Sequence, residues 1–334
     1  MFSGQLIGVD VGGTKVAVAT LEHGRLSESV VRPTEASSSD EVVAEMVAAV
    51  DEVRSSRTVA VGVGVPSVVD FATGRVRSST NLHLADLDLR LVLAERLGLP
   101  VFVDNDATVA ALAEAFDDAG EPIVQNLVMF TVGTGIGGGL VLGGRVYRGA
   151  TGAAAELGHT LVGVDAAEGV PQPGEFPQPG SLESLAAGRV LDRLAAQVAE
   201  RSPSSPLGKL AAAGKAVDGH DAVDAAQAGD PEAIEQLRIL GERLGIGIAN
   251  ALNTFDPDVV VVGGGVSTAG ELLLGPAREV ARSFSLPGVG ERAEIRLARY
   301  GRQAGVRGAA LLAGLELARG DDAFVPPRRE VEPA

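Results

Sequence analysis

The sequence contains one pattern twice, and this internal similarity restricts the fold more than any other feature. Residues 7–21 and 128–142 align at a constant offset, so that Val11-Gly12 pairs with Val132-Gly133. Each copy reads as an apolar strand, a glycine turn, a second apolar strand and another tight turn. Two unrelated hairpins could also look alike. If one supersecondary unit is used twice, we expect two similar halves whose glycine turns converge on one cleft.

Strand-like and helix-like patterns alternate along the chain, which predicts an α/β protein. The expected strands outside the two copies are 59–65, 101–103 and 259–262, and the expected helices in the first half are 40–54, 88–97 and 107–116. Beyond residue 184 the pattern is mainly helical, apart from a Ser/Pro stretch at 201–206. At about 150 residues per domain, a chain of 334 residues is long enough for two domains.

Composition argues against several classes of protein. A net charge of −16 opposes binding to nucleic acid, and the absence of cysteine excludes disulfides, thiolate zinc sites and iron–sulfur clusters. No apolar run approaches the roughly 20 residues that cross a bilayer, and no basic start of a secretory signal is present. We therefore expect a cytoplasmic protein with no nucleic-acid partner and no membrane partner.

Both glycine turns are candidates for phosphate binding, because a turn without side chains exposes backbone N–H groups to an anion. The second turn contains a Gly-x-Gly-x-x-Gly match at residues 133, 135 and 138. A strand follows this match where a dinucleotide-binding fold requires a helix, and the Walker pattern is absent. We therefore expect the two turns to hold a polyphosphate without a Rossmann fold.

Two aspartates follow expected strands. Asp10 could hold Mg²⁺ through water beside phosphates, or could form a turn by bonding its own backbone. Asp106 ends the run Asp104-Asn105-Asp106 between a strand and a helix. A carboxylate there could cap the helix, or could act as a general base toward a sugar hydroxyl that attacks a phosphoryl group. Local pattern leaves both choices open.

Two further motifs have both a functional and an ordinary interpretation. Glu156 and His159 are three residues apart, so they could form hydrogen bonds to vicinal hydroxyls of a substrate or simply to each other. The glycines 263–265 follow an expected buried strand. They could admit a flat ring or a phosphate, or form a tight turn.

In this order, the segments resemble the ROK family of repressors, open reading frames and kinases, within the sugar kinases of the actin-like ATPase (ribonuclease H-like) fold. The resemblance covers about residues 5–315. It is carried by Asp10-Val-Gly-Gly-Thr-Lys15, Ser78-Ser-Thr-Asn-Leu82, Asn105-Asp106-Ala107, Gly133-Thr-Gly-Ile-Gly-Gly138, Glu156-Leu-Gly-His159, Leu182-Glu183 and Val262-Gly-Gly-Gly265. It implies two domains around a deep cleft, MgATP and a hexose as substrates, and a homodimer or homotetramer.

The resemblance also implies roles for single residues, with Asp106 as the catalytic base. The residues implied to contact the sugar are Asn81, Asn105, Asp106, Glu156, His159 and Glu183. The residues implied to bind the nucleotide and its phosphates are Asp10, Gly12, Gly13, Thr14, Lys15, Gly133, Thr134, Gly135, Gly264 and Gly265. Asp10 would hold Mg²⁺ through water.

The sequence departs from the family in one loop. Most members carry a zinc loop of the form Cys-x-Cys-Gly-x-x-Gly-Cys-x-Glu, and here the three cysteine positions hold Gly174, Phe176 and Ser181. None of these can replace a thiolate, so we expect no zinc site. The repeated Pro-Gln-Pro-Gly at 171–174 and 177–180 could stiffen the loop instead.

We expect a smaller domain over residues 1–108, a larger domain over 109–308, a last helix near 303–319 that packs back on the first domain, and a disordered tail over 321–334. The expected activity is transfer of the γ-phosphoryl group of MgATP to glucose, giving glucose 6-phosphate. N-acetylglucosamine or N-acetylmannosamine could be the acceptor instead, and polyphosphate could be the donor. A non-catalytic sugar binder and a sugar-sensing repressor are alternatives of another class, although a helix-turn-helix domain has no room before residue 12.

Overall fold

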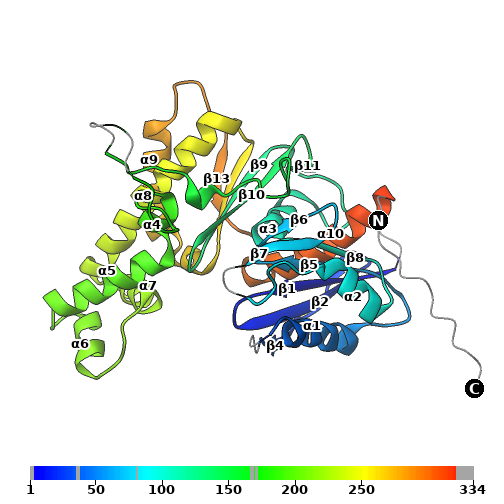
Figure 1. The fold of residues 1–334 in the computed structure, drawn as a ribbon. Helices are drawn as coiled ribbons and strands as arrows, with labels where there is room; N and C mark the ends of the chain where they lie inside the picture. The colour runs from blue at the N-terminus through cyan, green and yellow to red at the C-terminus, as the bar shows by residue number, and fades with distance from the viewer. Residues whose placement is uncertain (1–3, 35–37, 80–81, 166–168, 170–171, 321–334) are drawn as a thin grey trace, which may run out of the picture. The chain divides into compact units, whose positions relative to one another are not determined.

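A computed structural model describes residues 4–34, 38–79, 82–165, 169 and 172–320, in which strands and helices alternate (Figure 1). The expected sugar contact Asn81 and the expected disordered tail lie outside these residues. None of the helices in the described ranges is long and apolar enough to cross a membrane.

Two sheets with the same strand order form the frame of the chain. The first contains β1 (Gln5–Val11), β2 (Lys15–Glu22), β3 (Arg25–Leu26), β4 (Val30–Pro33), β5 (Thr58–Val65) and β8 (Val101–Asn105). Its order is β3-β2-β1-β5-β8, with β4 also paired to β2. The second contains β9 (Leu127–Val132), β10 (Ile136–Leu142), β11 (Arg145–Val146), β12 (Val259–Gly263) and β13 (Glu294–Leu297), in the order β11-β10-β9-β12-β13. Both sheets therefore repeat one plan, which confirms the duplication predicted from residues 7–21 and 128–142.

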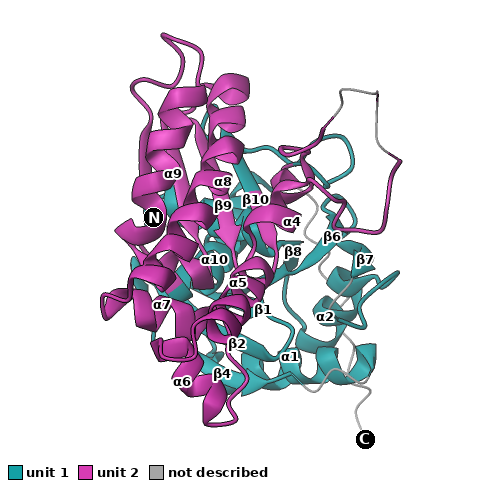
Figure 2. Cartoon of the chain, turned by 90° about the vertical axis from the view of Figure 1, so that its left-hand side faces the viewer, with its two compact units in different colours: residues 1–125, 139–154, 302–334 teal, residues 126–138, 155–301 magenta. Residues whose placement is uncertain are grey.

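Contacts along the chain define two compact units, coloured separately in Figure 2. Unit 1 contains residues 1–125, 139–154 and 302–334, and unit 2 contains residues 126–138 and 155–301. The sequence-based boundary between residues 108 and 109 lies inside unit 1, within helix α3 (Asp106–Ala115). The four passages of the chain between the units follow residues 125, 138, 154 and 301.

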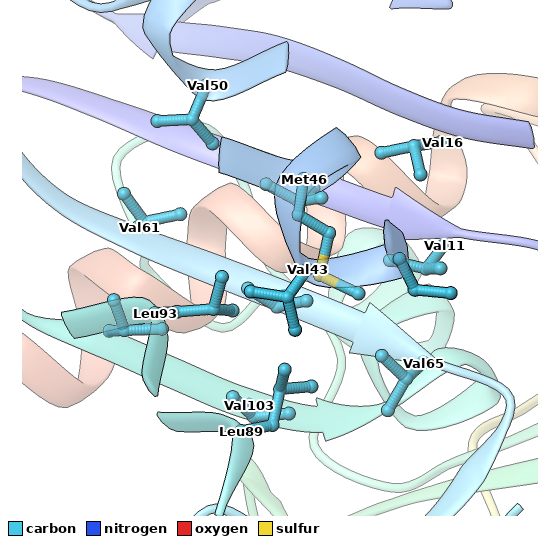
Figure 3. Close-up of a cluster of buried hydrophobic side chains, with 14 of the residues drawn as sticks. Val11, Val16, Val43, Met46, Val50, Val61, Val65, Leu89, Leu93 and Val103 are labelled. Carbon is cyan, nitrogen blue, oxygen red and sulfur yellow. The ribbon is translucent and has the colours of Figure 1, made fainter. Parts of the chain in front are cut away.

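One face of the first sheet is built by alternation along its strands. Odd-numbered residues such as Val61 and Val103 pack against helices α1 (Ser39–Val53) and α2 (Leu89–Leu97) (Figure 3). Met46 of α1 and Leu93 of α2 are fully buried in this cluster. Because successive side chains of a strand point to opposite faces, the even-numbered residues of β1 and β5 face the other side.

The other face of this sheet receives the last helix, α10 (Ala304–Arg319), drawn red beside the blue strand β1 in Figure 1. Gly8 and Gly62 occupy even-numbered positions of β1 and β5. A Cβ atom on Gly8 would lie 1.9 Å from the carbonyl oxygen of Val306, and one on Gly62 would lie 1.8 Å from that of Ala309. Glycine therefore lets the backbone of α10 lie directly on the sheet.

Unit 2 contains most of the remaining helices. They are η1 (Leu157–His159), α4 (Leu182–Ala186), α5 (Gly188–Arg201), α6 (Pro206–Ala212), α7 (Gly219–Gln227), α8 (Pro231–Phe255), η2 (Gly265–Ala269) and α9 (Glu271–Phe284). The ribbon of β6 (Ser67–Asp70) and β7 (Arg75–Ser79) belongs to unit 1. The turn η3 (Gly301–Gln303) passes from unit 2 into unit 1 and leads into α10.

Candidate active site

Asp10 and Asp106 are close enough in unit 1 to interact electrostatically, because β1 and β8 pair with opposite edges of the same strand, β5. Strands β1 and β8 both pair in parallel with β5, and the register places Asp10 beside Gly64 and Gly64 beside Asp104. A Cβ atom on Gly64 would lie 2.7 Å from a methyl group of Val109 and 3.6 Å from the Cα atom of Asp106. Gly64 therefore leaves room for the first turn of α3 between the two carboxylates.

The carboxyl group of Asp10 is held in a strongly perturbed environment. Burial, and after it the negative charge of Asp106, raises the pKa of Asp10 from 3.8 to about 6, while Lys15 opposes the shift. Gly305, in the first turn of α10, lies directly against this carboxylate, since a Cβ atom there would be 2.3 Å from the Cγ atom of Asp10. Sequence reasoning missed Gly305, because the contact joins residues from opposite ends of the chain.

The carboxylate of Asp10 fits Mg²⁺ bound through water. Mg²⁺ commonly binds one or two carboxylates and takes its other ligands from water and substrate phosphates. Within the described ranges no cluster of three or more His, Cys, Asp or Glu residues could hold a metal ion, so substrate phosphates would have to supply the remaining ligands. Two like charges that repel each other, with one lysine in partial compensation, favour a bound cation.

The structure shows which residue caps the helix at the end of β8. The side-chain oxygen of Asn105 accepts hydrogen bonds from the N–H groups of Ala107 (2.9 Å) and Thr108 (3.2 Å), so Asn105 is the N-cap of α3. Asp106 is the first helical residue, and its Oδ1 accepts from Ala107 N at 2.8 Å. Burial raises the pKa of Asp106. The carboxylate of Asp106 therefore does not serve as the N-cap, and its raised pKa suits a proton acceptor.

The first glycine turn is short and exposed. The N–H of Gly12 bonds the carbonyl of Lys15 at 2.8 Å, and the N–H of Thr34 bonds the carbonyl of Thr14 at 2.9 Å. Gly13, Thr14 and Lys15 are exposed. The turn thus has a fixed backbone and an open surface.

At three of the glycines predicted to bind phosphate or nucleotide, neither the backbone conformation nor a neighbouring protein atom excludes a Cβ atom. Gly13, Gly133 and Gly265 have no heavy atom within 4 Å of a built Cβ, and their φ angles lie outside the left-handed region. Gly264 differs, since its φ is +88° and a Cβ there would lie 2.4 Å from the carbonyl of Val132. A side chain at the first three positions would meet only a bound ligand, which is what a phosphate cradle requires.

Glu183 lies against the second glycine turn. Its Oε2 accepts a hydrogen bond from the N–H of Ile136 at 2.7 Å. A Cβ atom on Gly135 would lie 2.4 Å from the same oxygen, so a larger residue there would displace the carboxylate of Glu183. Gly188, at the start of α5, donates its N–H to the carbonyl of Gly133 at 2.7 Å. The segment that carries Glu183 therefore braces the turn at two points.

Glu156 and His159 lie at the turn η1 of unit 2. Nε2 of His159 is 3.9 Å from Oε2 of Glu156, and its Nδ1 is buried with no hydrogen-bond partner among the residues described. The edge of the imidazole meets Phe176, with ring centroids 5.4 Å apart. A buried nitrogen without a partner is costly unless a ligand or water satisfies it.

The loop that departs from the family pattern has its own internal hydrogen bonds. The side chain of Gln178 accepts from the N–H of Gly174 and donates to its carbonyl, both at 2.6 Å. Ser181 caps α4 by accepting from the N–H of Ser184 at 3.2 Å. These bonds brace the loop beside Phe176 and lead into the helix that carries Glu183.

The predicted residues divide between the units. Unit 1 holds Asp10, Gly12, Gly13, Thr14, Lys15, Asn105 and Asp106. Unit 2 holds Gly133, Thr134, Gly135, Glu156, His159, Glu183, Gly264 and Gly265.

Comparison with known proteins finds relatives along nearly the whole chain. A glucokinase from Halalkalibacterium halodurans is 33% identical over 317 residues, which cover 92% of this chain and 94% of the relative. An N-acetyl-D-glucosamine kinase from Escherichia coli is 31% identical over 318 residues, which cover 91% of this chain and 98% of the relative.

A solved structure has the same architecture. The crystal structure of a ROK family glucokinase from Streptomyces griseus, in complex with glucose and AMPPNP, is similar with a TM-score of 0.78 and 35% identity. The similarity covers 93% of this chain and 99% of the other, and the two-sheet fold is that of the actin-like ATPases. The family model described as the ROK family matches residues 6–315, and the chain belongs to this family.

Proposed function

We propose that the chain is an ATP-dependent hexose kinase whose acceptor is glucose. The observation that carries this proposal is the pair Asp10 and Asp106: Asp10 lies near the end of β1, Asp106 begins the helix that follows β8, and Asn105 takes the role of helix cap. The glucokinase relatives and the structure with glucose and AMPPNP support the choice of acceptor and donor.

In this mechanism the residues of unit 1 handle the proton. The carboxylate of Asp106 accepts the proton of the sugar hydroxyl as its oxygen attacks the γ-phosphorus; the new O–P bond forms, the bond to the β-phosphate oxygen breaks, and ADP leaves. The raised pKa of Asp106 makes it a better acceptor than an ordinary aspartate. Mg²⁺ held near Asp10 would neutralise phosphate charge.

The residues of unit 2 bind and orient the substrates. The turn at Gly133 leaves open space for phosphate oxygens, because a Cβ atom built there meets no heavy atom within 4 Å, although the N–H of Gly133 itself bonds the carbonyl of Gly135 at 2.9 Å. Nδ1 of His159 is a buried polar atom that a sugar hydroxyl would satisfy, and Glu183 keeps acceptor capacity beyond its bond to Ile136. Such hydrogen bonds orient the hydroxyl that reacts.

N-acetylglucosamine is a second candidate acceptor. The ring of Phe176 is 74% exposed at the edge of His159, and an acetyl methyl group is the kind of apolar substituent that such a ring contacts. One relative is an N-acetyl-D-glucosamine kinase. The variant Phe176→Ala separates the candidates, because it should lower turnover of N-acetylglucosamine more than that of glucose if the ring contacts the acetyl group.

The test of the proposed function is ADP release by the purified protein with MgATP and, in turn, glucose, mannose, fructose, N-acetylglucosamine and N-acetylmannosamine. We expect glucose-dependent turnover that Asp106→Asn lowers to a small residual rate, and polyphosphate is tried as donor in a parallel series. If no sugar raises ADP release above the rate with ATP alone, the kinase proposal is wrong and a sugar-binding role replaces it.

A further inference from the structure

A charged cluster lies in unit 1 directly behind the base. The guanidinium of Arg148 donates to Oδ2 of Asp104 at 2.7 Å and to Oε1 of Glu316 at 3.2 Å. Its central carbon lies 3.5 Å from the centre of the ring of Phe71. Asp104 is 1% exposed and Glu316 is 4% exposed. The cluster joins strand β8, helix α10 and the segment after β11.

Burying the charges of this cluster costs folding free energy. Moving charges out of water costs several kcal/mol per ion, and apolar residues of similar volume often give equal or greater stability. Burial raises the pKa of Asp104, and Arg148 is the main group that opposes the shift. Glu316 adds to the rise, and the hydrogen bond and positive charge of Arg148 oppose it. A role in fixing geometry explains an arrangement that stability alone does not favour.

The cluster reaches Asp106 through a short series of hydrogen bonds. Oδ1 of Asp104, the oxygen not bonded to Arg148, accepts the N–H of Asn105 at 2.9 Å. Asn105 then holds the N–H of Ala107 at 2.9 Å, and Ala107 also donates to Asp106 at 2.8 Å. The orientation of the Asp104 carboxylate thus determines where strand β8 ends and helix α3 begins.

We propose that Arg148 is a positioning residue for the general base: by holding Asp104, it fixes the turn between β8 and α3 from which Asp106 projects. Arg148 does not touch substrate in this role. The kinetic tests of this inference rest on the proposed kinase activity. The structural test depends only on the backbone of β8 and α3.

The kinetic test compares Arg148→Met, which keeps bulk and removes the charge, with Arg148→Lys, which keeps the charge but loses the planar fork. A displacement of the base by about 1 Å can cost about 100-fold in rate. We expect kcat of Arg148→Met to fall by about 10- to 100-fold with both KM values within about twofold, and Arg148→Lys to recover part of the loss.

A matched control is available on α10, the helix that carries Glu316. Arg307 is 2% exposed and pairs with Asp118 at 2.6 Å, beyond the C-terminal end of α3. Arg307→Met removes a buried guanidinium of the same kind away from Asp106. We expect it to lower the unfolding midpoint in urea while kcat changes by less than about threefold.

A double-mutant comparison shows whether the effect passes through Asp106. In an Asp106→Asn background the base is absent, so adding Arg148→Met should change the residual rate by less than about twofold. A further loss as large as in the wild-type background would overturn the proposal, because Arg148 would then act on something other than the base.

The structural readout needs no activity. Hydrogen exchange of the peptide covering β8 and the start of α3 should be faster in Arg148→Met than in wild type. In Arg307→Met it should be unchanged, when the proteins are compared under conditions that leave the same fraction of each folded. If the protein proves not to be a kinase, this measurement still decides the positioning. If Arg148→Met does not fold, Glu316→Gln replaces it in each experiment, because this variant weakens the second ion pair of Arg148. Unchanged exchange in the variant that folds would refute the inference.

Discussion

The contact between Gly305 and Asp10 makes a sharp prediction for the substitution Gly305→Ala. The added methyl carbon would lie 2.3 Å from Cγ of Asp10 and 2.4 and 2.7 Å from its two oxygens, whereas ordinary contacts begin at 3.4 Å. The carboxylate or the first turn of α10 must therefore retreat by about 1 Å. A misplacement of this size near the reacting groups can cost about 100-fold, or about 2.7 kcal/mol of transition-state stabilisation.

Stability should respond much less than activity. Alanine is favoured over glycine inside a helix by up to about 1 kcal/mol, while overpacking costs about 1–3 kcal/mol, so these effects partly cancel. We expect kcat/KM to fall about 100-fold and the Mg²⁺ concentration for half-maximal rate to rise, with a change in unfolding free energy below about 2 kcal/mol. Phosphoryl transfer is measured across a Mg²⁺ titration, and stability by urea unfolding.

The matched control is Gly245→Ala, which crowds α8 against α9 in unit 2. Its added carbon would lie 2.6 Å from the carbonyl of Ala277. It should lower stability by a similar or greater amount and leave the Mg²⁺ dependence unchanged. If Gly305→Ala keeps kcat/KM within about threefold of wild type, the position of Asp10 does not control the reaction and the reasoning is refuted.

Three other substitutions test the remaining features. Burial raises the pKa of Asp10 from 3.8 to about 6. Between these pH values the folded protein binds one proton more than the unfolded chain, so its stability falls as the pH rises through this range. Without Mg²⁺ or nucleotide, Asp10→Asn should therefore be more stable than wild type by up to about 3 kcal/mol at pH 7.5. Urea unfolding at pH 7.5 and pH 4 checks this, and a gain that persists at pH 4 would contradict it. Gly133→Ala meets no protein atom, so its unfolding midpoint should stay constant while calorimetry shows weaker binding of an ATP analogue; unchanged affinity would remove the turn from the phosphate site. Glu183→Gln replaces an oxygen that accepts from Ile136, so glucose and the ATP analogue should both bind more weakly; a loss for glucose alone would show that the bond does not order the turn.

The local elements were predictable because each depends on short-range patterns. The strand at 59–65 and the helix at 40–54 match β5 and α1 to within one residue at each end. The duplicated hairpins and the position of Asp106 at a helix start also followed from alternation and turn residues. Such signals are contained within about 15 residues and need no knowledge of packing.

The identity of the helix cap was not predictable, because asparagine and aspartate are both good N-caps. Backbone angles decide it, and they place Asn105 outside the helix and Asp106 inside. The pairs Asp104 with Arg148 and Asp10 with Gly305 join distant parts of the chain. The glycines at positions 8 and 62 were a usable signal, since glycine at alternate positions of buried strands indicates close approach of another backbone.

The place of α10 in the chain also affects how the protein forms during synthesis. Every strand of both sheets leaves the ribosome before α10 does. Unit 2 is then complete in sequence, while the first sheet still shows the glycine face that α10 will cover. Asp10 acquires its contact with Gly305 only when this helix docks. A nascent chain stalled before Ala304 should therefore lack activity and expose backbone groups that other chains or chaperones can bind.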